Sequence, residues 1–158
     1  MKRILIILII GFVFVTVQAQ MDNPLKKGMP NTVTLSTGDV VYDLNGEWDA
    51  VYDSVVYLFA GGQDRETKKD IVKITQEGNK FVGIKLVGDE IVGKNQETVK
   101  GELEKNGFRK VYIVIWDTNV LRASWAPSKA EISEDGNKIV VKCHPNNWQK
   151  NMIVLNRK

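Results

Sequence analysis

The sequence predicts an all-β domain: an antiparallel meander of about eight strands, closed into a barrel. Short runs of alternating apolar and polar residues follow one another from Asp39 to Lys158, and no segment keeps a helical period. Turn pairs such as Asn45-Gly46 and Asn106-Gly107 separate these runs, in a chain with 13 glycines and 4 prolines. Closing the sheet removes the unpaired edges that eight antiparallel strands would otherwise leave. A β-sandwich is the alternative.

The first 38 residues precede this domain. Residues 1–19 combine a basic start, an apolar run and small residues before a predicted cleavage after Ala19, as in a secretory signal peptide. The apolar run is shorter than the ~20 residues that a membrane-spanning helix needs, so we expect cleavage rather than anchoring. Residues 20–38 form either a flexible lead-in or an edge strand near 32–35. We therefore expect the domain at 39–158 to be periplasmic or secreted and not to span a membrane.

The charge balance and the rare residues exclude several classes of function. Without Lys2 and Arg3, 20 basic residues face 19 acidic ones, which gives no reason to expect a nucleic acid partner. The single cysteine, Cys143, excludes an internal disulfide, and with the single histidine, His144, it offers little basis for a metal site or cofactor. Adjacent strand residues face opposite sides, so these two cannot form a nucleophile–base pair. We expect Cys143 to be a buried small hydrophobe.

The first expected strand covers residues 47–53, with Trp48 facing inward. Residues 54–59 either extend it beyond a bulge or form a lid segment, and 64–69 is expected to be a charged loop. Three hairpins follow, at 70–76 with 80–87, 98–104 with 110–116, and 129–133 with 138–143. A strand at 120–125 is expected to end before Pro127. A rim loop at 144–151 then leads to a last strand at 152–157.

Gly46-Glu47-Trp48 resembles the Gly-x-Trp that opens the barrel in the lipocalin and avidin group, the calycins. The hairpin at 74–83 is similar to the second hairpin of small bacterial lipocalin-like domains. In lipocalins a basic residue late in the barrel lies across the Trp ring, and Arg157 matches that position. The resemblance implies that Gly46, Trp48 and Arg157 close one end of the barrel. This sequence shows no helix before its final strand and no Thr-Asp-Tyr turn, both usual in lipocalins, and no biotin-contacting set can be matched.

Aromatic residues on the expected strands are the candidate ligand contacts. These are Tyr52, Tyr57, Tyr112, Trp116 and Trp125, with Arg122 as a charge for an acidic ligand at the barrel mouth. The same aromatics fit a packed core equally, so a filled interior stays open as an alternative. The strand at 111–115 is apolar on both faces and needs a second covering, from the lead-in, a partner subunit or a ligand.

These observations favour an exported, non-catalytic barrel that binds a small, largely apolar molecule. The alternative is a protein-binding module, such as a periplasmic protease or lysozyme inhibitor, with residues 20–38 as an inserting arm. An enzyme is not expected, because Asp49 and Asp53 lie ~13 Å apart along one strand and no other acid–base set can be assembled. Since Trp48 and Arg157 are expected to close one end, a ligand is expected toward the other.

Overall fold

The computed structural model describes residues 31–158, and these residues form ten β-strands. The strands are β1 (Thr32–Thr34), β2 (Val40–Tyr42), β3 (Gly46–Tyr57), β4 (Gln63–Glu77), β5 (Lys80–Lys85), β6 (Glu97–Glu104), β7 (Gly107–Asp117), β8 (Arg122–Ile132), β9 (Lys138–Asn146) and β10 (Gln149–Arg157). No helix in the described part of the chain has the length and apolarity to cross a membrane. The predicted signal peptide and its cleavage after Ala19 lie outside the described residues.

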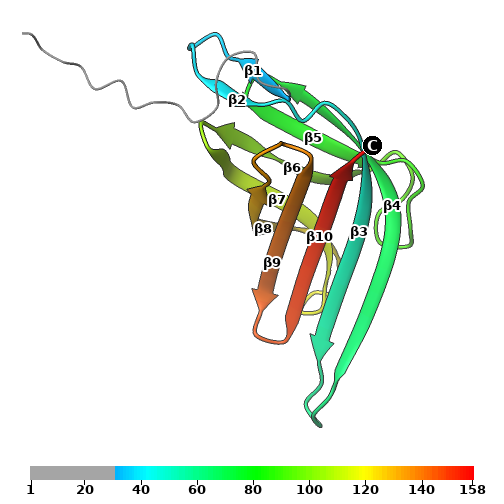
Figure 1. Cartoon of the computed structure of the whole chain (residues 1–158). Helices are drawn as coiled ribbons and strands as arrows, with labels where there is room; N and C mark the ends of the chain where they lie inside the picture. The colour runs from blue at the N-terminus through cyan, green and yellow to red at the C-terminus, as the bar shows by residue number, and fades with distance from the viewer. Residues whose placement is uncertain (1–30) are drawn as a thin grey trace, which may run out of the picture.

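Eight strands, β3 to β10, close into one barrel (Figure 1). Each pairs antiparallel with the next, and β10 returns to pair with β3. The predicted all-β, eight-stranded antiparallel meander is confirmed, and the β-sandwich alternative is not what forms. Alternation along each strand produces the core, because β3 buries Trp48 and Ala50 while Glu47 and Asp49 stay exposed.

One end of the barrel is packed shut. The β1–β2 hairpin, which pairs only within itself, adds its side chains to the core at this end. Val41 and Leu44 are fully buried there. Strand β1 thus lies within the expected lead-in at 20–38, whose residues before Asn31 are outside the described part.

Trp48 and Arg157 meet at this packed end. The guanidinium carbon of Arg157 lies 4.5 Å from the centre of the Trp48 ring, the arrangement expected from the sequence. The indole Nε1 of Trp48 donates to the carbonyl of Leu44 at 3.0 Å. Arg157 also donates to the carbonyl of Asn45 at 2.9 Å and to that of Asp43. One cation therefore joins the last strand to the turn that begins the first strand of the barrel.

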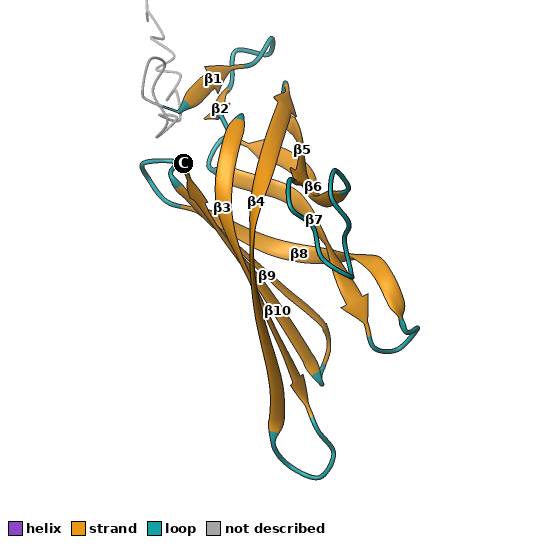
Figure 2. Cartoon of the chain, turned by 90° about the vertical axis from the view of Figure 1, so that its right-hand side faces the viewer, coloured by secondary structure: helices purple, strands orange, loops and turns teal. Residues whose placement is uncertain are grey.

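The opposite end is open. Figure 2 shows the β3–β4 and β9–β10 hairpins diverging from the β7–β8 hairpin toward this end. The hairpin tips carry exposed apolar side chains, among them Leu58, Phe59, Leu121 and Trp148. The interior is thus reached from the end at which these hairpins diverge.

The β3–β4 hairpin is longer than the sequence suggests. Strand β3 continues through residues 54–57 with no register shift, and residues 64–69, expected to be a loop, belong to β4. The loop prediction was wrong because most side chains at 63–69 are exposed, so charged residues suit the cross-strand pairs of this part of the hairpin. Arg65, for example, donates to both carboxylate oxygens of Asp53 at 2.8 Å.

The expected rim loop at 144–151 is instead a tight turn between β9 and β10. Strand β9 continues to Asn146 and β10 starts at Gln149. The side-chain oxygen of Asn146 accepts from the Trp148 N–H at 2.8 Å, a local bond that lets Asn form short turns. Sequence reasoning missed this because turn residues and loop residues have the same composition.

Strand β8 runs through Pro127 rather than ending before it. Pro127 lies opposite Tyr112 of β7. The ladder between β8 and β9 covers only residues 129–132 of β8. Pro127 therefore lies outside that ladder, and its missing N–H removes no hydrogen bond to β9. For this reason the prediction that the strand ends before Pro127 was wrong.

Candidate functional site

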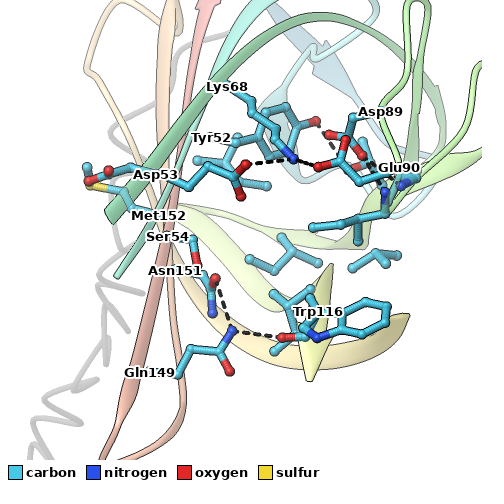
Figure 3. Close-up of a pocket in the computed structure, with 18 of the residues that line it drawn as sticks. Tyr52, Asp53, Ser54, Lys68, Asp89, Glu90, Trp116, Gln149, Asn151 and Met152 are labelled. Atoms are coloured by element: carbon cyan, nitrogen blue, oxygen red, sulfur yellow. Dashed lines mark hydrogen bonds and ion pairs between the residues drawn. The ribbon is translucent and has the colours of Figure 1, made fainter. Parts of the chain in front are cut away.

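A cavity of about 370 Å³ occupies the open half of the barrel (Figure 3). Strands β3 to β7 and β10, with the segments between β5 and β6 and between β7 and β8, supply its lining. Its deep wall is apolar, since Ile113 and Ile115 of β7, Ile153 of β10 and Val92 of the β5–β6 segment are buried around it. The cavity lies on the far side of the core from Trp48 and Arg157.

A polar group lies beside this apolar wall, since Tyr52 is paired directly with Ile153. The hydroxyls of Tyr52 and Thr98 lie 3.2 Å apart, and the ammonium of Lys85 lies 4.0 Å from the centre of the Tyr52 ring. Burial raises the pKa of Tyr52, and its hydrogen bond to Thr98 only partly opposes this. The phenol is therefore protonated across the physiological range and is available to both donate and accept.

Lys85 is the most unexpected residue of the interior, because its side chain is only 2% exposed. It follows Phe81 and Gly83 on the inward face of β5, and all three are buried. A buried ammonium needs compensation. Lys85 pairs directly with Asp89, and its Nζ lies 3.9 Å from Oδ2 of Asp70.

Asp70 anchors the segment between β5 and β6 to strand β4. Its carboxylate accepts from the backbone N–H of Val87 at 3.1 Å and from that of Gly88 at 2.9 Å. Gly88 has a φ of +86°, and a Cβ there would lie 2.3 Å from the backbone nitrogen of Lys94. Only glycine fits this close turn.

Asp89 belongs to the same segment and stabilises it by accepting hydrogen bonds from its backbone. Its Oδ1 accepts from the N–H groups of Ile91 at 2.9 Å and Val92 at 2.8 Å, while Oδ2 pairs with Lys85. Burial opposes the ionisation of Asp89, but these hydrogen bonds outweigh it and hold the pKa below its ordinary value. The carboxylate therefore places Ile91 and Val92 against the cavity.

Nearer the mouth, Lys68 links strand β4 to the β5–β6 segment. Its ammonium lies 3.1 Å from Glu66 and also pairs with Glu90. Partial burial works to lower the pKa of Lys68, but the hydrogen bonds to both glutamates outweigh it and raise that pKa. Figure 3 shows this pair of contacts beside Tyr52.

Two of the predicted contact residues line the cavity. Tyr52 does so with its side chain, and Trp116 is the second lining residue. The carbonyl of Trp116 accepts a hydrogen bond from Gln149 at 2.8 Å, and 43% of the residue is exposed. Gln149 is itself buried. Its side chain and that of Asn151 complete the wall on β10.

The other predicted contact residues lie away from the cavity. Tyr57 packs under Lys150, whose Nζ is 5.0 Å from the ring centre, and Trp125 packs under Lys100 at 4.0 Å. Tyr112 is exposed on β7, and Arg122 is exposed opposite Asp117. On β7 the alternation turns residues 111, 113 and 115 inward, so the aromatics between them face out.

Lys85, Thr98, Gln149 and Asn151 were missed by sequence reasoning. The signal for Lys85 was its place two residues after Gly83 in a strand whose alternate positions are apolar. Alternation puts it inside, although the usual expectation places lysine at the surface. No comparable signal marks Asn151, because polar residues precede it and the apolar run of the last strand begins only after it.

Other reactive groups offer little chemistry. Cys143 is buried as predicted, and burial raises the pKa of its thiol. Within residues 31–158, no group of three or more His, Cys, Asp or Glu is placed to hold a metal ion. The inward carboxylates are engaged with Lys68 and Lys85. The geometry offers apolar burial, hydrogen bonding and an overall acidic mouth.

No family model matches this chain, and no curated protein matches it. The architecture is therefore the finding: a small closed antiparallel barrel, packed at one end and hollow at the other. That fold is consistent with a binding module.

Proposed function

We propose that this chain is an exported, lipocalin-like barrel that binds a small, largely apolar molecule and catalyses no reaction. In this proposal residues 1–19 are a cleaved signal peptide, and the barrel that follows is the binding domain of a periplasmic or secreted protein. The resemblance at Gly46, Trp48 and Arg157 supports the lipocalin-like assignment, since these residues meet at the packed end.

The observation that carries the proposal is the cavity. Its volume of about 370 Å³ falls in the range of small-molecule sites, ~300–1,000 Å³. Its deep wall is made of buried aliphatic side chains, with a few hydroxyl, amide and ammonium groups beside them. Such a lining gives affinity through apolar burial and orientation through a few polar contacts.

The contacts of the polar groups support a non-catalytic role. Lys68 and Lys85 both form ion pairs with carboxylates, and the carboxylates of Asp70 and Asp89 accept hydrogen bonds from backbone N–H groups. Tyr52 keeps its proton because burial raises its pKa. The groups therefore support the wall of a cavity better than they support proton transfer.

The test is a cavity-blocking substitution with a control on the other face of the same strand. Val56 lines the cavity and its neighbour Val55 does not. We expect Val56→Trp to weaken binding of the neutral fluorophore phenylnaphthylamine at least about tenfold, equivalent to ~1.4 kcal/mol, and Val55→Trp to leave it unchanged. Fluorescence titration measures both, and circular dichroism checks the fold. Equal binding by Val56→Trp and the unsubstituted protein would contradict the proposal.

A protein-binding module, such as a protease or lysozyme inhibitor, is the second candidate. It is favoured by the exposed apolar tips around the open end, where Phe59 is 91% exposed and its ring centre lies 4.9 Å from that of Trp148, with the rings tilted by 40°. The proposed inserting arm, residues 20–38, lies mostly outside the described residues. Phe59→Ser should abolish capture of a host protein and leave fluorophore binding intact if this candidate holds. The reverse pattern would favour the carrier.

A further inference from the structure

A chain of amide contacts runs across the cavity wall from β7 to β10. The Nε2 of Gln149 donates to the backbone carbonyl of Trp116 at 2.8 Å and to Oδ1 of Asn151 at 3.5 Å, while its Oε1 accepts from Thr118 at 3.3 Å. A carbonyl oxygen only accepts, so Trp116 fixes which end of the Gln149 amide faces it. Gln149 in turn draws the oxygen of Asn151 toward itself, and the nitrogen of Asn151 faces away.

That nitrogen is a buried donor. Among the described residues, Nδ2 of Asn151 has no hydrogen-bond partner. Asn151 lines the cavity and lies directly opposite Ser54 of β3, which also lines it; Figure 3 shows the two side by side. Buried donors in folded proteins are nearly always satisfied, because leaving one unpaired is costly. An acceptor from the described chain is therefore missing at this position, and Asn151 belongs to the cavity lining.

The charges of the lining indicate which kind of acceptor fits. Five carboxylates and two ammonium groups line the cavity. The carboxylates are Asp53, Asp64, Glu66, Asp89 and Glu90. Both ammonium groups, Lys68 and Lys85, already contact two carboxylates each. An anionic ligand would meet an excess of negative charge and find no unengaged lysine on this lining.

We propose that the cavity selects an apolar molecule with an uncharged acceptor oxygen, such as a ketone, ester or ether, which accepts from Nδ2 of Asn151. The inference rests on the proposed function and names the ligand class. The aliphatic part lies against Ile113, Ile115 and Ile153, and the oxygen faces Asn151 and Ser54. A carboxylate at the same place would be repelled by Glu66, the residue opposite Ser54 on β4.

Four nine-carbon probes that differ only in their polar group test this class: methyl heptyl ketone, nonane, nonanoate and nonylamine. Each competes with phenylnaphthylamine for the full mature protein. We expect the ketone to bind about fivefold to tenfold more tightly than nonane, the range given by one hydrogen bond, and nonanoate to bind more weakly than the ketone. Asn151→Leu should reduce the ketone to the affinity of nonane.

The controls separate failure of this inference from failure of the proposed function. Asn156→Leu changes the same residue type on the outward face of β10 and should preserve the preference for the ketone. Asn151→Asp keeps an oxygen toward Gln149 and replaces the donor, so it tests the inference if Asn151→Leu does not fold. Ketone and nonane binding equally, or a preference that survives both Asn151 variants, would show that water alone satisfies Nδ2 and would overturn the inference. Absence of any fluorophore binding would overturn the proposed function itself.

Discussion

At the residue scale, the side chain of Arg157 makes several stabilising contacts at once. Its guanidinium covers the Trp48 ring, which contributes ~0.5–2 kcal/mol depending on desolvation. It also donates to the carbonyls of Asp43 and Asn45. Burial lowers the pKa of Arg157, and the Asp43 carboxylate opposes this. The residue remains a cation at all physiological pH values because arginine starts from a very high pKa.

We expect Arg157→Leu to lower the free energy of unfolding by about 1–3 kcal/mol, since it removes the cation–π contact and the hydrogen bonds to two carbonyls. Urea denaturation measures this. The neighbouring Lys158→Leu is the matched control, because Lys158 makes only an exposed ion pair with Glu47 at 3.4 Å and such pairs contribute little. Equal destabilisation by the two variants would show that the contacts of Arg157 stabilise the fold no more than the exposed ion pair of Lys158 does.

At the element scale, the segment between β5 and β6 is built as part of the cavity wall rather than as a free loop. Asp70 holds it from β4, Asp89 holds it from within, and Lys85 joins the two carboxylates. Gly88 allows the close turn that brings the segment back. Because Asp89 is an ionised anchor, protonating it should weaken the hold on this segment.

The effect of low pH on this segment can be tested at Asp89. Its pKa is lowered from an ordinary value of 3.8, so its contribution to stability is complete above that value and is lost as pH falls through the lower, folded-state pKa. We expect Asp89→Asn to reduce the free energy of unfolding by about 1.5–3 kcal/mol at neutral pH. The gap from the unsubstituted protein should shrink as pH falls below ~4. Urea denaturation across pH measures it, with Glu97→Gln as an exposed control. A gap independent of pH would contradict this account.

At the scale of the whole molecule, the two ends of the barrel differ in what fills them. The packed end holds Leu44 and Val41 fully buried beside Trp48. The open end holds a cavity and hairpin tips whose apolar residues face water. Stability is thus concentrated at one end, and the other is left available for binding, a division common in proteins whose rigid scaffold positions a binding surface.

Truncating leucine at each end tests this division. We expect Leu44→Ala to cost roughly 2–5 kcal/mol because it leaves a cavity in the core. Leu58→Ala, at a residue that is 51% exposed, should change stability by no more than about 0.5 kcal/mol. Thermal and urea unfolding of both variants provide the comparison. A large loss from Leu58→Ala would show that the open end is also packed.

Much of the architecture follows from local sequence. Alternation predicts the strands, Asn-Gly and related pairs predict the turns, and the strand count predicts closure. The main errors were local as well. Residues 64–69 and 144–151 were assigned to loops, although only 147 and 148 of the second range lie outside strands, because charged and amide residues form loops and exposed hairpins alike.

The sequence by itself determined that the chain folds as an antiparallel barrel, because strand period and turn chemistry are properties of neighbouring residues. That Trp48 faces Arg157 was implied by the resemblance of Gly46-Glu47-Trp48 to the lipocalin pattern. Only the tertiary structure decided what lines the interior. Strand 111–115 is apolar on both faces, so its sequence does not say which face turns inward. Lys85 and Asn151 enter the cavity because pairing between distant strands sets the register, and register is a long-range property that local patterns do not carry.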